Sequence, residues 1–205
     1  MNTKVIPASD PQALLKALAV LKKGGLVVYP TDTVYGVGGL AFDPGAIEQI
    51  YQVKGRDYNK AIPILLSDPF ELSRVTVGIG KAAHKLAERF WPGPLTLVVP
   101  RHPDLPENIS PDATIGVRMP DHPVALSLLR ISGPLATTSA NLSGEPSTRS
   151  ASEVVEQLGG RVPLVLDGGI TPGGTASTVV DCTSPEPVIL REGPISLQQI
   201  KEVLT

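Results

Sequence analysis

The sequence predicts an α/β fold in a single domain, in which helices flank a central, mixed sheet. Short apolar runs alternate along the chain with stretches whose apolar residues recur at helical spacing. Hydrophobic residues make up 41% and charged residues 19% of the 205 residues, a balance typical of globular proteins. No change in composition marks a linker, so residues 4–204 are interpreted as one sheet with its helices.

The first elements show how the pattern is interpreted. A helix is predicted over residues 11–23, because it begins with a proline and Leu14 and Leu18 recur at helical spacing. Gly24 ends this helix, and the apolar run 26–29 after it is predicted to be a buried strand. Further helices are predicted over residues 45–53, 81–90, 123–131, 151–158 and 197–204. Further strands are predicted over residues 62–66, 95–99, 114–117, 134–138, 164–166, 177–180 and 188–190.

Composition argues against several classes of protein. The net charge is −2 and the sequence pI is about 5.9, whereas a protein that only binds nucleic acid usually carries a basic excess. Cys182 is the only cysteine, so neither an intrachain disulfide nor a cysteine-based zinc site is expected. The chain has no apolar run long enough for a signal peptide or a membrane span, which predicts a cytoplasmic protein that does not enter a membrane.

Neither common nucleotide-binding motif fits the sequence. The Walker A motif ends in Gly-Lys-Ser/Thr, and the nearest candidate, residues 80–82, lacks the hydroxyl. Residues 36–41 match Gly-x-Gly-x-x-Ala, but they do not directly follow the strand and do not clearly open a helix. The three histidines have no spacing partner that indicates a metal site: His84, His102 and His122.

Hydroxyl side chains gather where predicted strands end. Residues 30–36, Pro-Thr-Asp-Thr-Val-Tyr-Gly, follow one strand, and residues 139–141, Ser-Ala-Asn, follow another. Ligands of α/β sheets commonly bind at strand ends, so these side chains could orient a small polar ligand or reach phosphate oxygens. Each segment could also be a turn whose polar groups are satisfied locally.

Cationic side chains gather in similar places. Lys54, Arg56 and Lys60 lie between a predicted helix and a predicted strand, while Arg118 and Arg191 each end a strand. Clustered arginine and lysine side chains could bind phosphate groups. The alternative for each residue is a solvated basic loop or a surface ion pair.

No single motif is specific, but their order and combination are. The motifs are PTDTVYG at 30–36, KGR at 54–56, WPGPLT at 91–96, VRMP at 117–120, SAN at 139–141, STVVD at 177–181 and REGP at 191–194. This combination resembles the YrdC family, the threonylcarbamoyl-AMP synthases, which are also called TsaC. The resemblance extends from about Lys4 to Leu204.

The resemblance implies a nucleotidyltransferase that joins L-threonine, bicarbonate and ATP into threonylcarbamoyl-AMP and releases pyrophosphate. Partner proteins of tRNA modification would use the product to make t6A in tRNAs that read ANN codons. Mg²⁺ is expected on the ATP phosphates. The implied fold is a twisted mixed sheet with flanking helices and an open concave face, without the additional C-terminal domain of longer relatives.

The resemblance also implies roles for individual residues. Its Lys-x-Arg and Ser-x-Asn signature falls on four residues expected to be catalytic and to bind ATP: Lys54, Arg56, Ser139 and Asn141. Further ATP contacts are expected at Lys60, Thr114, Ser147 and Arg191. Threonine contacts are expected at Thr33, Tyr35, Arg118, Thr137 and Ser177, with Arg118 suited to the carboxylate. Some relatives place a histidine where this chain has Leu65, so that contact is absent or made by another residue.

Two alternatives remain open. A basic concave face could bind double-stranded RNA or tRNA without catalysis, and a steep salt dependence without ATP turnover would favour that function. A similar domain also occurs in hydrogenase-maturation carbamoyltransferases. Those proteins are larger and carry zinc-finger-like and acylphosphatase-like parts, for which this chain has neither the cysteines nor the length.

Overall fold

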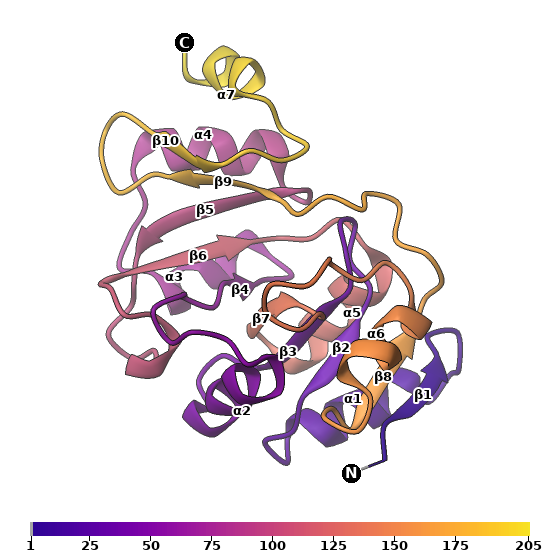
Figure 1. Ribbon diagram of the computed structural model, residues 1–205. Helices are drawn as coiled ribbons and strands as arrows, with labels where there is room; N and C mark the ends of the chain where they lie inside the picture. Colours follow the sequence, from indigo (N-terminus) through magenta and orange to yellow (C-terminus); the bar gives the residue numbers. More distant parts are fainter. Residues whose placement is uncertain (1) are drawn as a thin grey trace.

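The computed structural model describes residues 2–205 and confirms the predicted α/β fold class (Figure 1). Within these residues ten strands form one mixed sheet, in the order β1-β8-β2-β3-β7-β4-β6-β5-β9-β10. The strands are β1 (Lys4–Pro7), β2 (Val27–Tyr29), β3 (Gly36–Leu40), β4 (Ile64–Leu65), β5 (Leu95–Pro100), β6 (Thr114–Arg118), β7 (Leu135–Ser139), β8 (Leu164–Asp167), β9 (Thr178–Asp181) and β10 (Val188–Arg191).

Helices flank the sheet. They are α1 (Ala13–Leu21), α2 (Pro44–Lys54), α3 (Leu72–Val75), α4 (Lys81–Phe90), α5 (Pro123–Ser132), α6 (Ala151–Leu158) and α7 (Leu197–Leu204), with two 3-10 helices, η1 (Pro69–Glu71) and η2 (Glu107–Ile109). The bounds predicted for α4, α6 and α7 are confirmed. Side-chain caps fix the start of two of them, since the hydroxyls of Ser150 and Ser196 accept hydrogen bonds from the first turns of α6 and α7. The sequence did not predict β1, β3 or α3.

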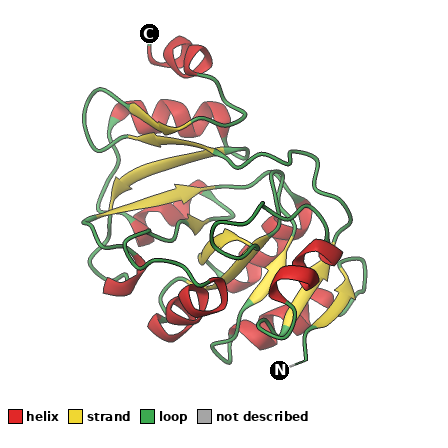
Figure 2. Cartoon of the chain, viewed as in Figure 1, coloured by secondary structure: helices red, strands yellow, loops and turns green. Residues whose placement is uncertain are grey.

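Two helical layers enclose the part of the sheet around β2 (Figure 2). Val27 and Tyr29 point to one face, where they pack in an apolar cluster with buried residues of α1 and α5. Val28, between them, points to the other face and joins the cluster that includes Ile47 of α2 and Val154 of α6. This alternation with a period of two residues explains why β2 is apolar throughout: both of its faces are covered.

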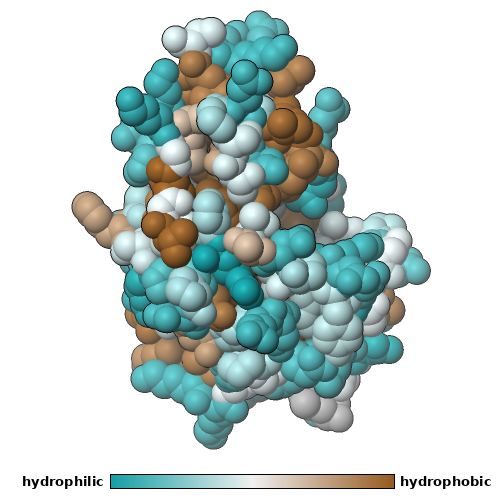
Figure 3. All heavy atoms as spheres, turned by 90° about the vertical axis from the view of Figure 1, so that its left-hand side faces the viewer, coloured by the Kyte–Doolittle hydropathy of each residue, from teal (hydrophilic) through white to brown (hydrophobic). Residues whose placement is uncertain are grey.

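The other end of the sheet is covered less completely. α4 packs against β5, and α7 packs against α4 at the end of the molecule that holds the C-terminus (Figure 1). Val188 and Leu190 of the edge strand β10 are exposed, and apolar side chains gather on this upper half of the molecule (Figure 3). Among residues 2–205, no helix combines the length and the apolar character needed to cross a bilayer.

Candidate active site

A pocket of about 330 Å³ opens near the middle of the sheet. Its walls come from segments that lie far apart in the sequence, namely β3 to β7, β9 and β10 with their connecting loops. Three arginines line it, together with eight hydroxyl side chains: Thr31, Thr33, Tyr35, Thr96, Thr137, Thr138, Ser139 and Ser177. The lining includes no carboxylate, lysine, histidine or cysteine side chain. A pocket with this lining favours anionic, hydrogen-bonding ligands.

Arg118 lies at one end of the pocket, held by three hydrogen bonds. Its Nε donates to the carbonyl of Gly93 over 3.0 Å, and one terminal nitrogen donates to Thr33 Oγ1 over 3.1 Å. The other terminal nitrogen forms an ion pair with Asp32 Oδ1. Burial lowers the pKa of Arg118, and the neighbouring Asp32 carboxylate opposes that shift. The guanidinium is therefore buried and fixed in orientation.

The hydroxyl of Thr33 presents a hydrogen-bond acceptor to this end of the pocket. Thr31 Oγ1 donates its single proton to the carbonyl of Val34 over 2.7 Å. Thr31 Oγ1 also accepts from the backbone amides of Thr33 and Val34 over 3.2 and 3.3 Å, and it lies 3.0 Å from Thr33 Oγ1. Thr33 Oγ1 accepts from Arg118 over 3.1 Å, which leaves it a further lone pair for a ligand.

Thr137 of β7 also presents a hydrogen-bond acceptor to the pocket. Its hydroxyl donates to the carbonyl of Leu135 over 3.2 Å, so the 2.7 Å contact with Tyr29 uses the tyrosine proton. Thr137 lies opposite Gly38 in the antiparallel pair of β3 and β7. A Cβ atom at Gly38 would lie only 2.7 Å from Thr137 Oγ1, so the absence of a side chain there makes room for this hydroxyl.

Ser177 and Arg191 form a third group. Arg191 donates to the carbonyl of Ser177 through Nε over 3.1 Å and through a terminal nitrogen over 2.8 Å. That nitrogen also donates to Ser177 Oγ, which lies 2.8 Å from Thr96 Oγ1. The hydrogen bond between the two hydroxyls uses one of their two protons. One hydroxyl proton therefore remains for a ligand.

Arg56 lies at the end of the pocket formed by the connection after α2. Gly55 caps α2 in the left-handed conformation, with φ of 58°, and turns the chain so that Arg56 leaves the helix. Arg56 Nε and one terminal nitrogen donate to the carbonyls of Lys60 and Ala61 over 3.1 and 2.8 Å. Burial lowers the pKa of Arg56. Ser139, at the end of β7, also lines the pocket.

Lys54 and Asn141 lie behind the pocket and do not line it. The buried Lys54 Nζ donates to the main-chain carbonyls of Ser139 and Asn141. The Asn141 amide donates to the carbonyls of Leu142 and Glu145, each over 2.8 Å. Burial, with a contribution from Arg56, lowers the pKa of Lys54 to about 7. In this structure Lys54 holds the backbone that carries Ser139.

Of the remaining residues that the sequence analysis named for the site, some line the pocket and others do not. Tyr35 lines the pocket, but its hydroxyl donates to the carbonyl of Gly169 over 2.7 Å and accepts from the amide of Gly168. Burial raises the pKa of this tyrosine to about 12. Leu65 contributes an apolar wall. Three residues lie outside the lining, one of them exposed and two half-buried: Lys60, Thr114 and Ser147.

Sequence reasoning missed Thr31, Thr96 and Asp32 as residues of the site. Thr31 and Asp32 belong to the hydroxyl-rich segment 30–36, and Thr96 ends the WPGPLT motif. Their contacts are with residues distant in sequence, such as Arg118 for Asp32 and Ser177 for Thr96. The motifs contained them, but their partners could be identified only from the fold.

The family model described as Telomere recombination, Sua5_yciO_yrdC, matches residues 19–193. The chain belongs to the Sua5/YciO/YrdC family. It is 42% identical to a Bacillus subtilis protein named threonylcarbamoyl-AMP synthase, over 98% of this chain and 59% of that protein. It is 39% identical to a Mycobacterium tuberculosis protein named putative threonylcarbamoyl-AMP synthase, over 98% of this chain and 95% of that protein.

Solved structures agree with this membership. The structure of P. abyssi Sua5 complexed with L-threonine superposes with a TM-score of 0.90 at 41% identity, over 93% of this chain and 56% of that chain. The chain thus spans little more than half the length of P. abyssi Sua5. Family membership confirms the resemblance to YrdC proteins that the motifs indicated.

Proposed function

We propose that this YrdC-family protein makes threonylcarbamoyl-AMP and pyrophosphate from L-threonine, bicarbonate and MgATP. The observation that carries the proposal is a single pocket with three arginines, many hydroxyls and no acidic side chain in its lining. All three substrates bring negative groups to such a pocket. The names of the relatives and the L-threonine bound to P. abyssi Sua5 support the same substrates.

The end of the pocket around Arg118 suits the amino acid. Its guanidinium can bind the carboxylate of threonine, because arginine and carboxylate match in charge and geometry. Thr33 and Thr137 each present a lone pair, which suits the N–H groups of the amine. Ser177, through its pairing with Thr96, can donate to an oxygen of the substrate. Tyr35 contributes its ring and not a free hydroxyl.

The end around Arg56 and Arg191 suits the nucleotide. Both arginines line the pocket together with Ser139, and each can stabilise phosphate oxygens. Lys54 and Asn141 would act by fixing the backbone around Ser139. Three residues outside the lining would contact only a part of ATP that extends beyond the pocket: Lys60, Thr114 and Ser147.

The reaction needs positioning and charge stabilisation. The free amine of threonine attacks bicarbonate, which forms a carbamate and releases water. A carbamate oxygen then attacks the α-phosphorus of ATP, and the bond to the β-phosphate oxygen breaks as pyrophosphate leaves with the electron pair. Arginine side chains would reduce the repulsion between the two anions and stabilise the charge that develops. Mg²⁺ would arrive on the ATP phosphates, since the pocket lining offers no carboxylate ligand.

The product would serve tRNA modification. An acyl-adenylate is reactive towards water, so a protein that makes it needs an acceptor nearby. We propose that partner proteins transfer the threonylcarbamoyl group to tRNAs that read ANN codons, where it completes the t6A modification.

The test is to incubate the protein with MgATP and isotope-labelled bicarbonate, with and without L-threonine, and to separate the products rapidly. We expect a labelled AMP adduct and pyrophosphate only when threonine is present. Arg56→Ala and Arg118→Ala should abolish the adduct, while Arg130→Ala, at an exposed position on α5, should leave it unchanged. Folded wild-type protein that forms no adduct under these conditions would contradict the proposal.

A further inference from the structure

Asp32 forms an ion pair with Arg118 from outside the pocket. Its carboxylate contacts a terminal nitrogen of the guanidinium, and the exposed fractions of the two side chains are only 12% and 7%. Asp32 does not line the pocket, whereas its neighbours Thr31 and Thr33 do. A ligand in the pocket would therefore meet Arg118 and not Asp32.

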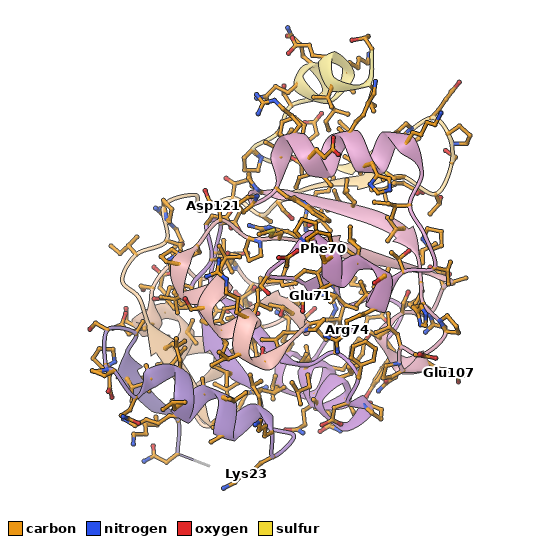
Figure 4. The ribbon with its side chains drawn as sticks, turned by 180° about the vertical axis from the view of Figure 1, so that it is seen from behind. Lys23, Phe70, Glu71, Arg74, Glu107 and Asp121 are labelled. Atoms are coloured by element: carbon orange, nitrogen blue, oxygen red, sulfur yellow. The ribbon has the colours of Figure 1, made fainter. Side chains whose placement is uncertain are left out.

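The same carboxylate oxygen joins two segments of the chain. Asp32 Oδ1 also accepts a hydrogen bond from the backbone amide of Asp121 over 3.1 Å. Asp121 lies in the short connection that leads into α5 (Figure 4). Asp32 Oδ2 is buried and has no hydrogen-bond partner among residues 2–205. The position of Asp32 is thus set by contacts with Arg118 and with the chain at Asp121.

Arg118 is held at three points on two segments, the loop between β2 and β3 and the chain at Gly93. These points are the carbonyl of Gly93, the hydroxyl of Thr33 and the carboxylate of Asp32. A guanidinium has five N–H donors, so two remain, one on each terminal nitrogen. A carboxylate that binds in the bidentate manner accepts two such donors. Without Asp32, one terminal nitrogen loses its only anchor, and the planar group is held at two points instead of three.

The pair also sets the charge at this end of the pocket. Arg118 and Asp32 are opposite charges, so together they are close to neutral, which matches an amino acid zwitterion better than a lone cation does. From this geometry we infer that Asp32 is a positioning residue for amino-acid binding, which orients Arg118 toward the substrate carboxylate. The inference rests on the proposed function, because it assumes that an α-amino acid binds at Arg118.

Calorimetry can test the inference without turnover. The dissociation constants of L-threonine and MgATP are measured separately for wild-type protein, Asp32→Ala, Asp32→Asn and Asp121→Asn. L-threoninol, which lacks the carboxylate, serves as the second amino ligand. Asp121→Asn is the matched control, since it removes a nearby carboxylate but leaves the backbone amide that Asp32 accepts from. Circular dichroism confirms that each variant is folded.

In Asp32→Ala we expect the affinity for L-threonine to fall at least about tenfold, the size of a lost hydrogen bond to a charged group. The affinity for MgATP should stay within about twofold of the wild-type value. The preference for L-threonine over L-threoninol should shrink, because the lost binding energy comes from the contact between Arg118 and the carboxylate of L-threonine. Asp32→Asn should recover most of the affinity, since an amide oxygen can still accept from Arg118 and Asp121. Asp121→Asn should behave like the wild type.

Two results would overturn the inference, and only the second would also overturn the proposed function. If the Asp32→Ala variant binds L-threonine as tightly as the wild type, or loses L-threonine, L-threoninol and MgATP equally, Asp32 does not position Arg118. The proposed function then stands. If the wild-type protein itself binds no L-threonine, the proposed function fails and the inference fails with it.

Discussion

The side chain of Lys54, at the C-terminal end of α2, donates a hydrogen bond to the main-chain carbonyl of Ser139, which lies 85 residues further along the chain. The same amine donates to the carbonyl of Asn141. Lys54 is buried and does not line the pocket. This lysine therefore connects the end of a helix to the end of β7, and its contribution to the site is the fixed position of Ser139.

Lys54→Met is expected to destabilise the protein at about pH 10, where burial of the lysine charge penalises the wild type little. The variant keeps the apolar part of the side chain but leaves two carbonyls without their donor, at a cost of about 2–4 kcal/mol in the free energy of unfolding. Urea denaturation measures this loss. Lys85→Met is the matched control, because Lys85 is exposed on α4. Equal stability of the two variants would show that the contacts of Lys54 contribute nothing to the fold.

The stability difference between wild-type protein and Lys54→Met should depend on pH. Burial lowers the pKa of Lys54 from 10.5 to about 7, so between these values the unfolded chain binds a proton that the folded chain does not. The wild type is therefore penalised most below pH 7, and its stability relative to the variant rises with pH from there to 10.5. The slope is at most about 1.4 kcal/mol per pH unit. Denaturation curves at several pH values measure it, and a pH-independent difference would contradict the lowered pKa.

The glycines of β3 show why the sequence alone did not predict this strand. Three of its five residues are glycine, which disfavours a strand on local propensity. The strand forms because it pairs with β2 and β7, and its neighbours leave no room for side chains. A Cβ atom at Gly39 would lie 2.8 Å from the Cβ of Ala46 in α2. These are contacts between distant segments, and a local pattern does not contain them.

Apart from α3 and β1, the helices and the remaining strands could be predicted because they depend on local signals. The capping serines of α6 and α7 precede apolar residues at helical spacing, and both helices have their predicted bounds. The candidate site was predictable in part, since arginines and hydroxyls at strand ends do meet in one pocket. The roles of Lys54 and Asp32 were not predictable, because each depends on which distant group the fold brings to it.

Gly38→Ala is expected to disturb the amino-acid end of the pocket. The new methyl group would lie 2.7 Å from Thr137 Oγ1, so Thr137 or the strand must shift. Such overpacking costs about 1–3 kcal/mol of stability. We also expect the dissociation constant of L-threonine to rise, while that of MgATP changes less, because Thr137 lies at the amino-acid end.

The control for Gly38→Ala is Gly80→Ala. A Cβ atom at Gly80 would meet no atom within 4 Å, so this variant introduces the same chemical change without a contact. Thermal denaturation and calorimetry compare the two. Wild-type threonine affinity in a folded Gly38→Ala protein would show that Thr137 does not contact the ligand.

Arg191 should contribute to nucleotide binding through both its charge and its contacts with Ser177, and two variants separate these contributions. Arg191→Ala removes one of three cations from the pocket, and we expect MgATP affinity to fall about tenfold with a weaker dependence on salt. Arg191→Lys keeps the charge, but a single ammonium cannot reproduce the two bonds from Nε and a terminal nitrogen to the Ser177 carbonyl. Its affinity should therefore lie between those of the wild type and Arg191→Ala.

Binding of MgATP to the Arg191 variants is measured by calorimetry at low and high salt, with Arg130→Ala as the exposed control. If Arg191→Ala binds MgATP as tightly as this control, the nucleotide does not lie at this end of the pocket.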